Sequence, residues 1–168
     1  MKRSDVDAVE AANTALYDAF ETGDIDLMGA LWLADGDIDD IDDIADIADI
    51  ADIAEVTCVH PGWAPVRGRG AVLRSWSMIM ANTAYIQFFL TDVQVQVSGD
   101  IAVVTCGENI LTGMAVAGDT DDTDDDGSAP GFAGGRAVAT NIFRRTGDGW
   151  RLWVHHASPV LTAPAEDG

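Results

Sequence analysis

Residues 134–159, GGRAVATNIFRRTGDGWRLWVHHASP, are the stretch that decides the fold. Two runs rich in β-branched and aromatic residues flank the tetrapeptide TGDG at 146–149. An Asp-Gly pair between two such runs is a strong hairpin signal, because glycine adopts a positive φ without steric cost. The sequence therefore predicts two antiparallel strands joined by a tight turn. The second strand ends in a polar cluster, HHAS, at 155–158.

The chain upstream of this hairpin has the same β texture back to about residue 85. Residues 85–97 and 101–114 predict two further long strands, the first of them broken or bulged near Thr91-Asp92. Residues 117–133 are rich in Asp, Gly and Thr, which predicts the loop that leads into the hairpin. Four long antiparallel strands are therefore expected.

The first half of the chain predicts helices. Apolar residues recur at helical spacing between Ser4 and Gly23, over 25–34 and over 71–81. A short alternating run at 55–60 predicts one strand between the second and third helices. Three helices followed by four long strands give an α+β fold, with a curved sheet folded over the helices.

The net charge of −20 is unevenly distributed along the chain. Eight Asp residues in 37–54 and six in 119–126, with no basic residue in either segment, are nearly half of the 29 acidic residues. Such a field repels nucleic acid and anionic membranes, so neither is expected as a partner. Apolar runs long enough to cross a bilayer, and an apolar signal region near the start, do not occur in the sequence, so we expect a cytoplasmic protein.

The two acidic segments have low-complexity patterns. Residues 37–54 repeat Asp-Ile-(Asp or Ala), and a period of three fits neither a helix nor a strand, so the Ile side chains cannot share one buried face. We interpret this segment as a surface insert; the alternative is a partner or cation site made of Asp side chains. The run DTDDDG at 122–127 matches the start of an EF-hand loop, but Ala133 occupies position twelve, which favours a solvated acidic loop.

Cys58 and Cys106 both lie in apolar, strand-like runs. Two buried free thiols are the simpler interpretation, since a disulfide would need the two strands to be adjacent and in register. Walker, Rossmann and Cys/His zinc motifs do not occur in the sequence. We therefore expect neither a metal nor a cofactor.

Several short motifs occur in a fixed order along the chain. They are ETGD at 21–24, Trp32, VHPGW at 59–63, RG at 67–68, SW at 75–76, VVT at 103–105, ATNIF at 139–143, WRL at 150–152 and HASP at 156–159. Together with the order of the elements they resemble the SnoaL-like branch of the nuclear transport factor 2-like superfamily. The resemblance covers the chain except 37–54 and 117–133, which implies one domain over 1–160 and a tail at 161–168.

The resemblance implies a cystatin-like fold, in which a cone-shaped, curved antiparallel or mixed sheet wraps over three N-terminal helices and leaves a pocket at its open end. It also implies a homodimer formed through the outer face of the sheet. Members of the superfamily include ketosteroid isomerases, polyketide cyclases, dehydratases, epoxide hydrolases and plain binding modules, so the fold does not decide the function. The acidic base, tyrosine and protonated acid of the isomerases find no counterparts at these positions, which argues against steroid isomerisation.

The final strand alternates, and Trp150, Leu152, Val154 and His156 share one face. We assign this mostly apolar face to the concave side, which places His156 at the pocket wall. A pocket histidine can act as acid or base at neutral pH; the alternative is a silent histidine bonded to the helix layer. A His156 ring facing solvent would remove this support for a bound ligand.

Glu108 and Asn141 interrupt otherwise apolar strands. An inward Glu108 is a candidate general base with a raised pKa, because burial disfavours the charged form. An outward Glu108 would instead pair with an arginine at 136, 144 or 145. Asn141 is a candidate donor to a ligand carbonyl, or else makes a cross-strand contact.

Four more residues are candidate ligand contacts. Tyr17, Trp32 and Trp63 either line the pocket mouth or pack in the core or a lid. His60, before Pro61, is either a polar group at the rim or a loop anchor.

Two functional hypotheses follow. In the first, the pocket binds a small, mostly apolar organic molecule and catalyses cofactor-free isomerisation, cyclisation or dehydration, with His156 and either Glu108 or Asn141 as base and oxyanion donor. In the second, the chain is a non-catalytic binding or dimerisation module. The enzymatic hypothesis loses its main support if His156 and Glu108 lie on opposite faces of the sheet.

Overall fold

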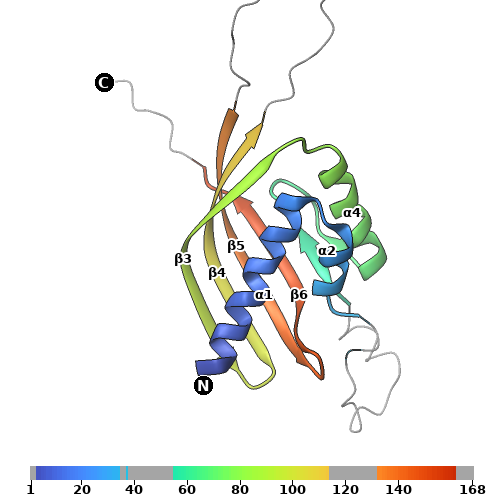
Figure 1. The fold of residues 1–168 in the computed structure, drawn as a ribbon, viewed down its shortest axis with the longest axis vertical. Helices are drawn as coiled ribbons and strands as arrows, with labels where there is room; N and C mark the ends of the chain where they lie inside the picture. Colours follow the sequence, from blue (N-terminus) through green and yellow to red (C-terminus); the bar gives the residue numbers. More distant parts are fainter. Residues whose placement is uncertain (1–2, 35–36, 38–54, 114–131, 162–168) are drawn as a thin grey trace, which may run out of the picture.

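The computed structural model describes residues 3–34, 37, 55–113 and 132–161 (Figure 1). The helices are α1 (Arg3–Thr22), α2 (Ile25–Leu31) and α4 (Arg69–Ala81). The strands are β1 (Thr57–Val59), β2 (Val66–Arg67), β3 (Ile86–Ser98), β4 (Ile101–Gly113), β5 (Phe132–Thr146) and β6 (Gly149–Pro159). The predicted α+β fold is confirmed. The triplet segment from residue 38 and the EF-hand-like run lie outside the described residues.

The six strands form one mixed sheet in the order β2-β1-β6-β5-β4-β3. Neighbours from β3 to β6 are antiparallel, as predicted, whereas β1 pairs with β6 in parallel. The sheet is not closed into a barrel, because β2 and β3 stand at its two ends in the described part of the chain. Figure 1 shows the long strands curving around α1, with α2 and α4 beside it.

Local signals explain the helix boundaries. Asp24 caps α2, since its Oδ1 accepts a hydrogen bond from the Leu27 N–H at 2.9 Å. The helix ends at Leu31, earlier than the predicted residue 34, because the chain turns extended at Trp32 and bridges to Leu152. Arg69 of α4 then binds the exposed carbonyl end of α2, with Nη1 2.8 Å from the Trp32 carbonyl oxygen.

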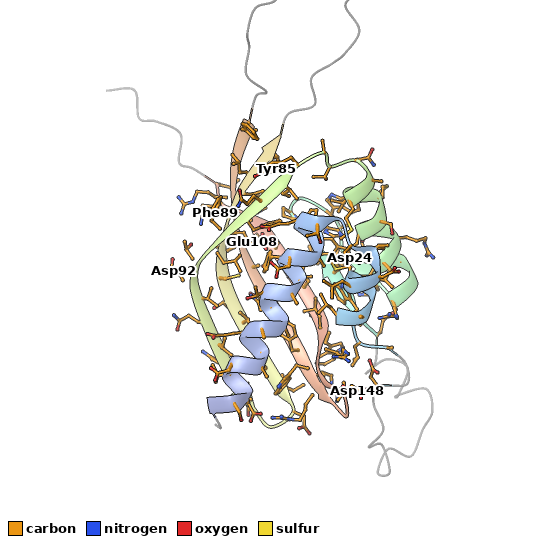
Figure 2. The ribbon with its side chains drawn as sticks, in the orientation of Figure 1. Asp24, Tyr85, Phe89, Asp92, Glu108 and Asp148 are labelled. Atoms are coloured by element: carbon orange, nitrogen blue, oxygen red, sulfur yellow. The ribbon has the colours of Figure 1, made fainter. Side chains whose placement is uncertain are left out.

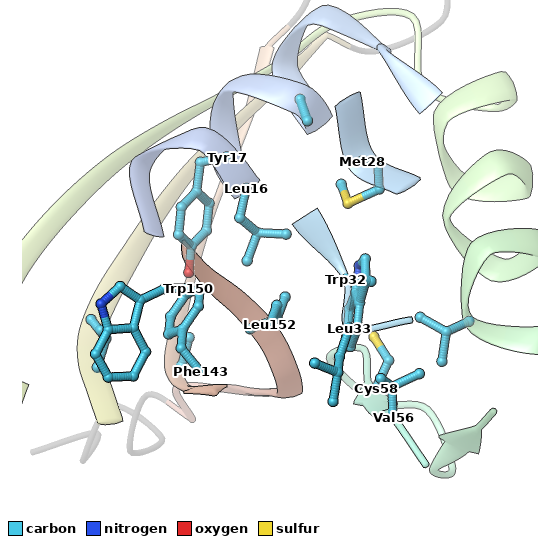
Figure 3. Packing of buried hydrophobic residues seen from close by; sticks show 14 of the residues in the cluster. Leu16, Tyr17, Met28, Trp32, Leu33, Val56, Cys58, Phe143, Trp150 and Leu152 are labelled. Carbon is cyan, nitrogen blue, oxygen red and sulfur yellow. The ribbon is translucent and has the colours of Figure 1, made fainter. Parts of the chain in front are cut away.

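The core lies between α1, α2 and the concave face of the sheet (Figure 3). Leu16 and Tyr17 of α1 point toward the side chains of Phe143, Trp150 and Leu152 on the β5–β6 hairpin. Leu152 and Phe143 are at most 1% exposed. Burying such side chains stabilises a fold by about 1.5–3 kcal/mol each, so the predicted hairpin is a main part of the core.

The predicted turn of this hairpin is confirmed. Gly149 has φ +113°, a conformation that side chains disfavour. The Thr146 hydroxyl donates to the Gly149 carbonyl at 2.8 Å and accepts from the Asp148 N–H at 3.2 Å.

Two β-bulges set which side chains face the helices. The register of β3 shifts between Thr91 and Gln94, and Asp92 has φ +52°, which confirms the bulge predicted near this site. A second bulge lies in β6, where Ile142 pairs with Val154 and Phe143 with Leu152, so that Trp153 is an extra residue. This bulge reverses the alternation of the residues after it.

Among the described residues, no helix is both long enough and apolar enough to cross a bilayer.

The close approach of β3 and β4 gives a test of this packing. A Cβ added at Gly107 would lie 2.7 Å from Thr91 Oγ1, whereas at Gly135 it would meet nothing within 4 Å. Gly107→Ala is therefore expected to lower the free energy of unfolding by about 1 kcal/mol, because the Thr91 hydroxyl must turn away and lose the hydrogen bond from Asn109 Nδ2, and Gly135→Ala to change it by less than about 0.5 kcal/mol. Urea unfolding measures both, and equal effects of the two variants would contradict the packing described.

Candidate active site

A cavity of about 240 Å³ lies between α1, α4 and the sheet. Most of its wall is apolar or aromatic. The wall is formed by helices α1 and α4, by strands β3, β4 and β6, and by the loop after β1. Its lining residues are Leu16, Tyr17, Phe20, His60, Pro61, Trp63, Trp76, Ile79, Ile86, Phe88, Glu108, Ile110, His155 and Ala157. Four of these carry polar, titratable groups: Tyr17, His60, Glu108 and His155.

Glu108 faces inward and is 3% exposed. The Tyr17 hydroxyl of α1 donates to its Oε1 at 2.7 Å, and Figure 2 shows Glu108 between β4 and α1. Burial raises the pKa of Glu108, and the hydrogen bond from Tyr17 opposes this only in part. The alternative of an outward Glu108 paired with an arginine is wrong; Arg145, for example, pairs with Asp5 and Asp100.

Asn141 lies behind the cavity wall and connects Tyr17 to His155 through hydrogen bonds. Its Oδ1 lies 2.6 Å from His155 Nδ1, and its Nδ2 donates to Asn13 Oδ1 at 2.8 Å and to the Tyr17 hydroxyl at 3.3 Å. Asn141 is fully buried and does not line the cavity, so the geometry favours the cross-strand contact over direct donation to a ligand. The chain Glu108–Tyr17–Asn141–His155 is therefore one connected network.

The network fixes the tautomer of His155. Because Asn141 Oδ1 can only accept, His155 Nδ1 carries the hydrogen and Nε2 carries a lone pair. Burial lowers the pKa of His155 to about 3, with smaller contributions from His60 and His156. His155 is thus a neutral imidazole at physiological pH.

The placement of His156 at the pocket wall is wrong. The extra residue Trp153 in β6 reverses the alternation, so His155 faces the helices and His156 is exposed. His156 Nε2 lies 3.3 Å from the Ser158 hydroxyl, outside the cavity. The enzymatic hypothesis in its form based on His156 therefore loses its support, and His155 occupies the inward position instead.

His60 both lines the cavity and anchors its loop. The Ser75 hydroxyl donates to the Val72 carbonyl at 2.7 Å, so it must accept from His60 Nε2 at 2.9 Å. Burial lowers the pKa of His60 to about 4. Its ring packs edge-on against Trp63 and Trp76, with centroids 4.9 and 4.7 Å away.

The predictions for the two tryptophans have different outcomes. Trp63 lines the cavity and is 40% exposed, which places it at the mouth. Trp32 does not line the cavity; it is 1% exposed in the core, because the chain after α2 turns toward Leu152. The ligand contact predicted for Trp32 is therefore wrong, and its core alternative fits.

Several site residues were not among those predicted. Asn13 and Ser75 supply hydrogen bonds behind the wall, and Trp76, which the sequence showed only as part of the SW motif at 75–76, lines the cavity. The alternation predicted for the final strand placed His156 on the concave side and therefore left out its neighbour His155. A bulge adjacent to Trp153 carries no glycine or proline signal in the sequence, so alternation alone could not reveal it.

Cys58 and Cys106 are buried free thiols, and burial raises the pKa of Cys58 to about 12. Groups of three or more potential metal ligands do not occur among the described residues.

Comparisons with known proteins bear on this site. The family model of the SnoaL-like domain matches residues 9–162. A Streptomyces avermitilis protein of the nuclear transport factor 2-like family, provisionally named a dehydratase, is 51% identical with a TM-score of 0.77, over 95% of this chain and 98% of its own. A protein from Thiobacillus denitrificans, provisionally named a calcium/calmodulin-dependent protein kinase type II association domain, is 29% identical with a TM-score of 0.60, over 90% and 94% of the two chains.

A Pseudomonas putida protein of unknown function, also nuclear transport factor 2-like, shares the fold at 19% identity and a TM-score of 0.66, over 100% of this chain and 95% of its own. No curated protein matches the chain. The family-model match and the 51% identical relative, each spanning almost the whole sequence, show that this chain belongs to the SnoaL-like family of the nuclear transport factor 2-like superfamily.

Proposed function

We propose that this protein binds a small, mostly apolar organic molecule in the cavity and catalyses cofactor-free acid/base chemistry on it, with dehydration as the favoured reaction. The observation that carries the proposal is that His155 and Glu108 line one apolar cavity and are joined through Asn141 and Tyr17. The provisional name of the Streptomyces avermitilis relative supports dehydration over isomerisation and cyclisation.

His155 is the proposed base. Its hydrogen is held at Nδ1 by Asn141, so the lone pair at Nε2 is available to a ligand. The desolvation that keeps the imidazole neutral leaves this lone pair unprotonated at neutral pH, but it also weakens the base. The negative charge that develops on Glu108 in the same cavity offsets this during the reaction, because it stabilises the imidazolium. A proton on a carbon next to a carbonyl group is the group that such a base can remove.

Glu108 is the proposed acid. Burial raises its pKa and so favours the protonated carboxyl, which can donate a proton to a departing hydroxyl group. In the dehydration, the C–H electron pair becomes the new C=C bond as the C–O bond breaks, and water leaves. After this step His155 is protonated and Glu108 is ionised. Transfer of a proton from His155 to Glu108 restores the starting state of both side chains.

Tyr17 and Asn141 are proposed as positioning residues. Burial and the neighbouring Glu108 raise the pKa of Tyr17 well above its usual value, so its hydroxyl remains a donor to the carboxyl group. The hydrogen bond from Tyr17 stabilises Glu108 once it has lost its proton.

A non-catalytic binding module is the second candidate. It is favoured by the fact that Tyr17, Asn141 and the Nδ1 atom of His155 already satisfy one another inside the protein. The relative named as a kinase association domain is an example of the same fold in an assembly role by its name. Turnover, as opposed to binding, separates the two candidates.

A homodimer through the outer face of the sheet is also proposed. That face carries exposed apolar side chains, with Phe89, Val138 and Val160 at 52%, 54% and 37% exposure around adjoining grooves. Figure 2 shows Phe89 on the side of β3 that faces away from the helices. Exposed apolar patches of this kind mark contact surfaces between proteins.

The neutral state of the two buried imidazoles makes stability depend on pH. The pKa of His60 is lowered to about 4 and that of His155 to about 3, so below pH 6.5 the unfolded chain binds protons that the folded protein does not. The free energy of unfolding is expected to fall between pH 7 and pH 5 by about 2 kcal/mol for each histidine. The raised pKa of Glu108 acts in the opposite direction, so variants are compared with the wild type by urea unfolding at each pH.

The matched variants are His155→Phe and His156→Phe. His155→Phe is expected to reduce the fall in the free energy of unfolding between pH 7 and pH 5 by about 2 kcal/mol, the contribution of one histidine. His156→Phe is expected to leave this fall unchanged. A pH dependence that persists in His155→Phe and weakens in His156→Phe would reverse the assignment of the two rings.

Turnover tests the proposed chemistry. A panel of uncharged β-hydroxy ketones with one or two rings is incubated with the protein, and the conjugated enone is followed by its ultraviolet absorbance. His155→Phe and Glu108→Gln are each expected to lower kcat/KM by about 100-fold or more, and His156→Phe by less than about twofold. A folded His155→Phe variant with full turnover would contradict the role of His155, and binding without turnover in the wild type would favour the second candidate.

The oligomeric state tests the proposed dimer. Val138→Arg places a charge in the exposed apolar patch beside Arg136 and is expected to give a monomer in light-scattering chromatography. Met78→Arg alters a side chain that is 51% exposed on α4, away from the sheet, and should leave the dimer intact. A wild-type monomer, or a dimer disrupted only by Met78→Arg, would show that the outer sheet face is not the interface.

A further inference from the structure

The charge of the cavity wall limits what can bind there. Tyr17, His60, Glu108 and His155 are its titratable groups, and neither Lys nor Arg is among the described residues that line it. Both imidazoles are neutral and the tyrosine stays protonated, so Glu108 alone determines whether the wall is neutral or negative. An anion would therefore find no opposite charge in this wall.

The hydrogen-bond donors of the wall are already used within the protein. The Tyr17 hydroxyl donates to Glu108 Oε1 at 2.7 Å, and His155 Nδ1 donates to Asn141 Oδ1 at 2.6 Å. His60 Nε2 donates to the Ser75 hydroxyl at 2.9 Å. These three side chains consequently present no free hydrogen to a ligand.

The two tryptophans of the wall do not change this pattern. The Trp76 Nε1 atom is enclosed by protein atoms, so its hydrogen does not reach the cavity. Trp63 lies at the exposed mouth, where water can bind its indole nitrogen. Apart from His60 Nδ1, which lies 3.9 Å from Cys58 Sγ, the side-chain acceptor atoms of the wall that no other described side chain occupies are His155 Nε2, with its lone pair, and the second oxygen of the Glu108 carboxyl group.

A hydroxyl group matches this pair of groups. Its hydrogen satisfies the imidazole lone pair of His155, and its oxygen accepts from the Glu108 carboxyl group, whose protonated form is favoured by burial. A ketone has no hydrogen to offer and leaves the buried lone pair unsatisfied, which costs binding free energy. A carboxylate adds an unpaired charge in an apolar site, which costs far more.

We infer, resting on the proposed ligand binding, that the cavity selects uncharged ligands that carry a hydroxyl group on a ring system, and that it discriminates against ketones and carboxylates of the same shape. The ring preference follows from the aromatic side chains of Phe20, Phe88 and Trp76 in the wall. The volume of about 240 Å³ is smaller than that of sites for drug-sized ligands, which suits one or two rings.

Three compounds of one shape and one number of non-hydrogen atoms test the inference: 1-(2-naphthyl)ethanol, 2-acetonaphthone and 2-naphthoate. Their dissociation constants for the full chain are measured by isothermal titration calorimetry at pH 7.5. The alcohol is expected to bind at least about 5-fold more tightly than the ketone, which corresponds to the lower end of the cost of one unsatisfied buried polar group. The carboxylate is expected to bind at least about 100-fold more weakly than the alcohol.

His155→Phe provides the matched variant, with His156→Phe as its control. Removing the lone pair of residue 155 should bring the ratio of alcohol to ketone affinity close to one, whereas the same substitution at residue 156 should leave the ratio unchanged. This readout is a ratio within one variant, so a general loss of stability does not imitate it.

The outcomes separate this inference from the proposal on which it rests. Ketone or carboxylate binding as tight as alcohol binding overturns the selectivity while leaving ligand binding in place. Failure of all three compounds to bind overturns both. If His155→Phe keeps the selectivity for the alcohol, the imidazole of His155 does not recognise the hydroxyl group. This outcome also overturns the inference.

Discussion

The buried amide of Asn141 is the interaction on which the polar half of this structure depends. Fully enclosed in the sheet, it must satisfy both of its ends, and it does so with Asn13 and Tyr17 of α1 on one side and His155 of β6 on the other. The first helix is therefore tied to the sheet by hydrogen bonds of fixed direction as well as by apolar packing. An unpaired amide at this depth would cost about 1–3 kcal/mol, so the network and the packing of α1 support each other.

The order and type of the elements could be predicted because each depends on local signals. The Asp148-Gly149 turn and the bulge at Asp92 are encoded within a few residues, and the structure contains both. The end of α2 and the strand at Val66–Arg67 could not be predicted in this way. Both are set by partners far along the chain, since Trp32 bridges to Leu152 and β2 exists only by pairing with β1.

The residues of the site likewise include some that local sequence signals predict and one that they do not. Tyr17, His60, Trp63 and Glu108 were predicted as site residues, Glu108 because it interrupts an apolar strand and His60 because it precedes Pro61, and all four line the cavity. His155 was missed because a single extra residue in β6 reverses the facing of every side chain after it, and neither glycine nor proline marks that bulge. Strand alternation is thus a reliable guide to a face only as far as the first irregularity in register.

The direction of the Asn141 amide also decides what the cavity offers a ligand. With its oxygen toward His155, the imidazole carries its hydrogen on Nδ1 and shows a lone pair to the interior. The opposite orientation would set the amide nitrogen against His155, move the hydrogen to Nε2 and turn the wall from acceptor to donor. Tyr17 opposes this, because its one hydroxyl hydrogen is donated to Glu108 Oε1 and its oxygen can only accept from Asn141 Nδ2, at 3.3 Å. Asn13 Oδ1 accepts from the same nitrogen at 2.8 Å. Two residues of the first helix therefore determine, through one amide, whether the histidine can act as a base.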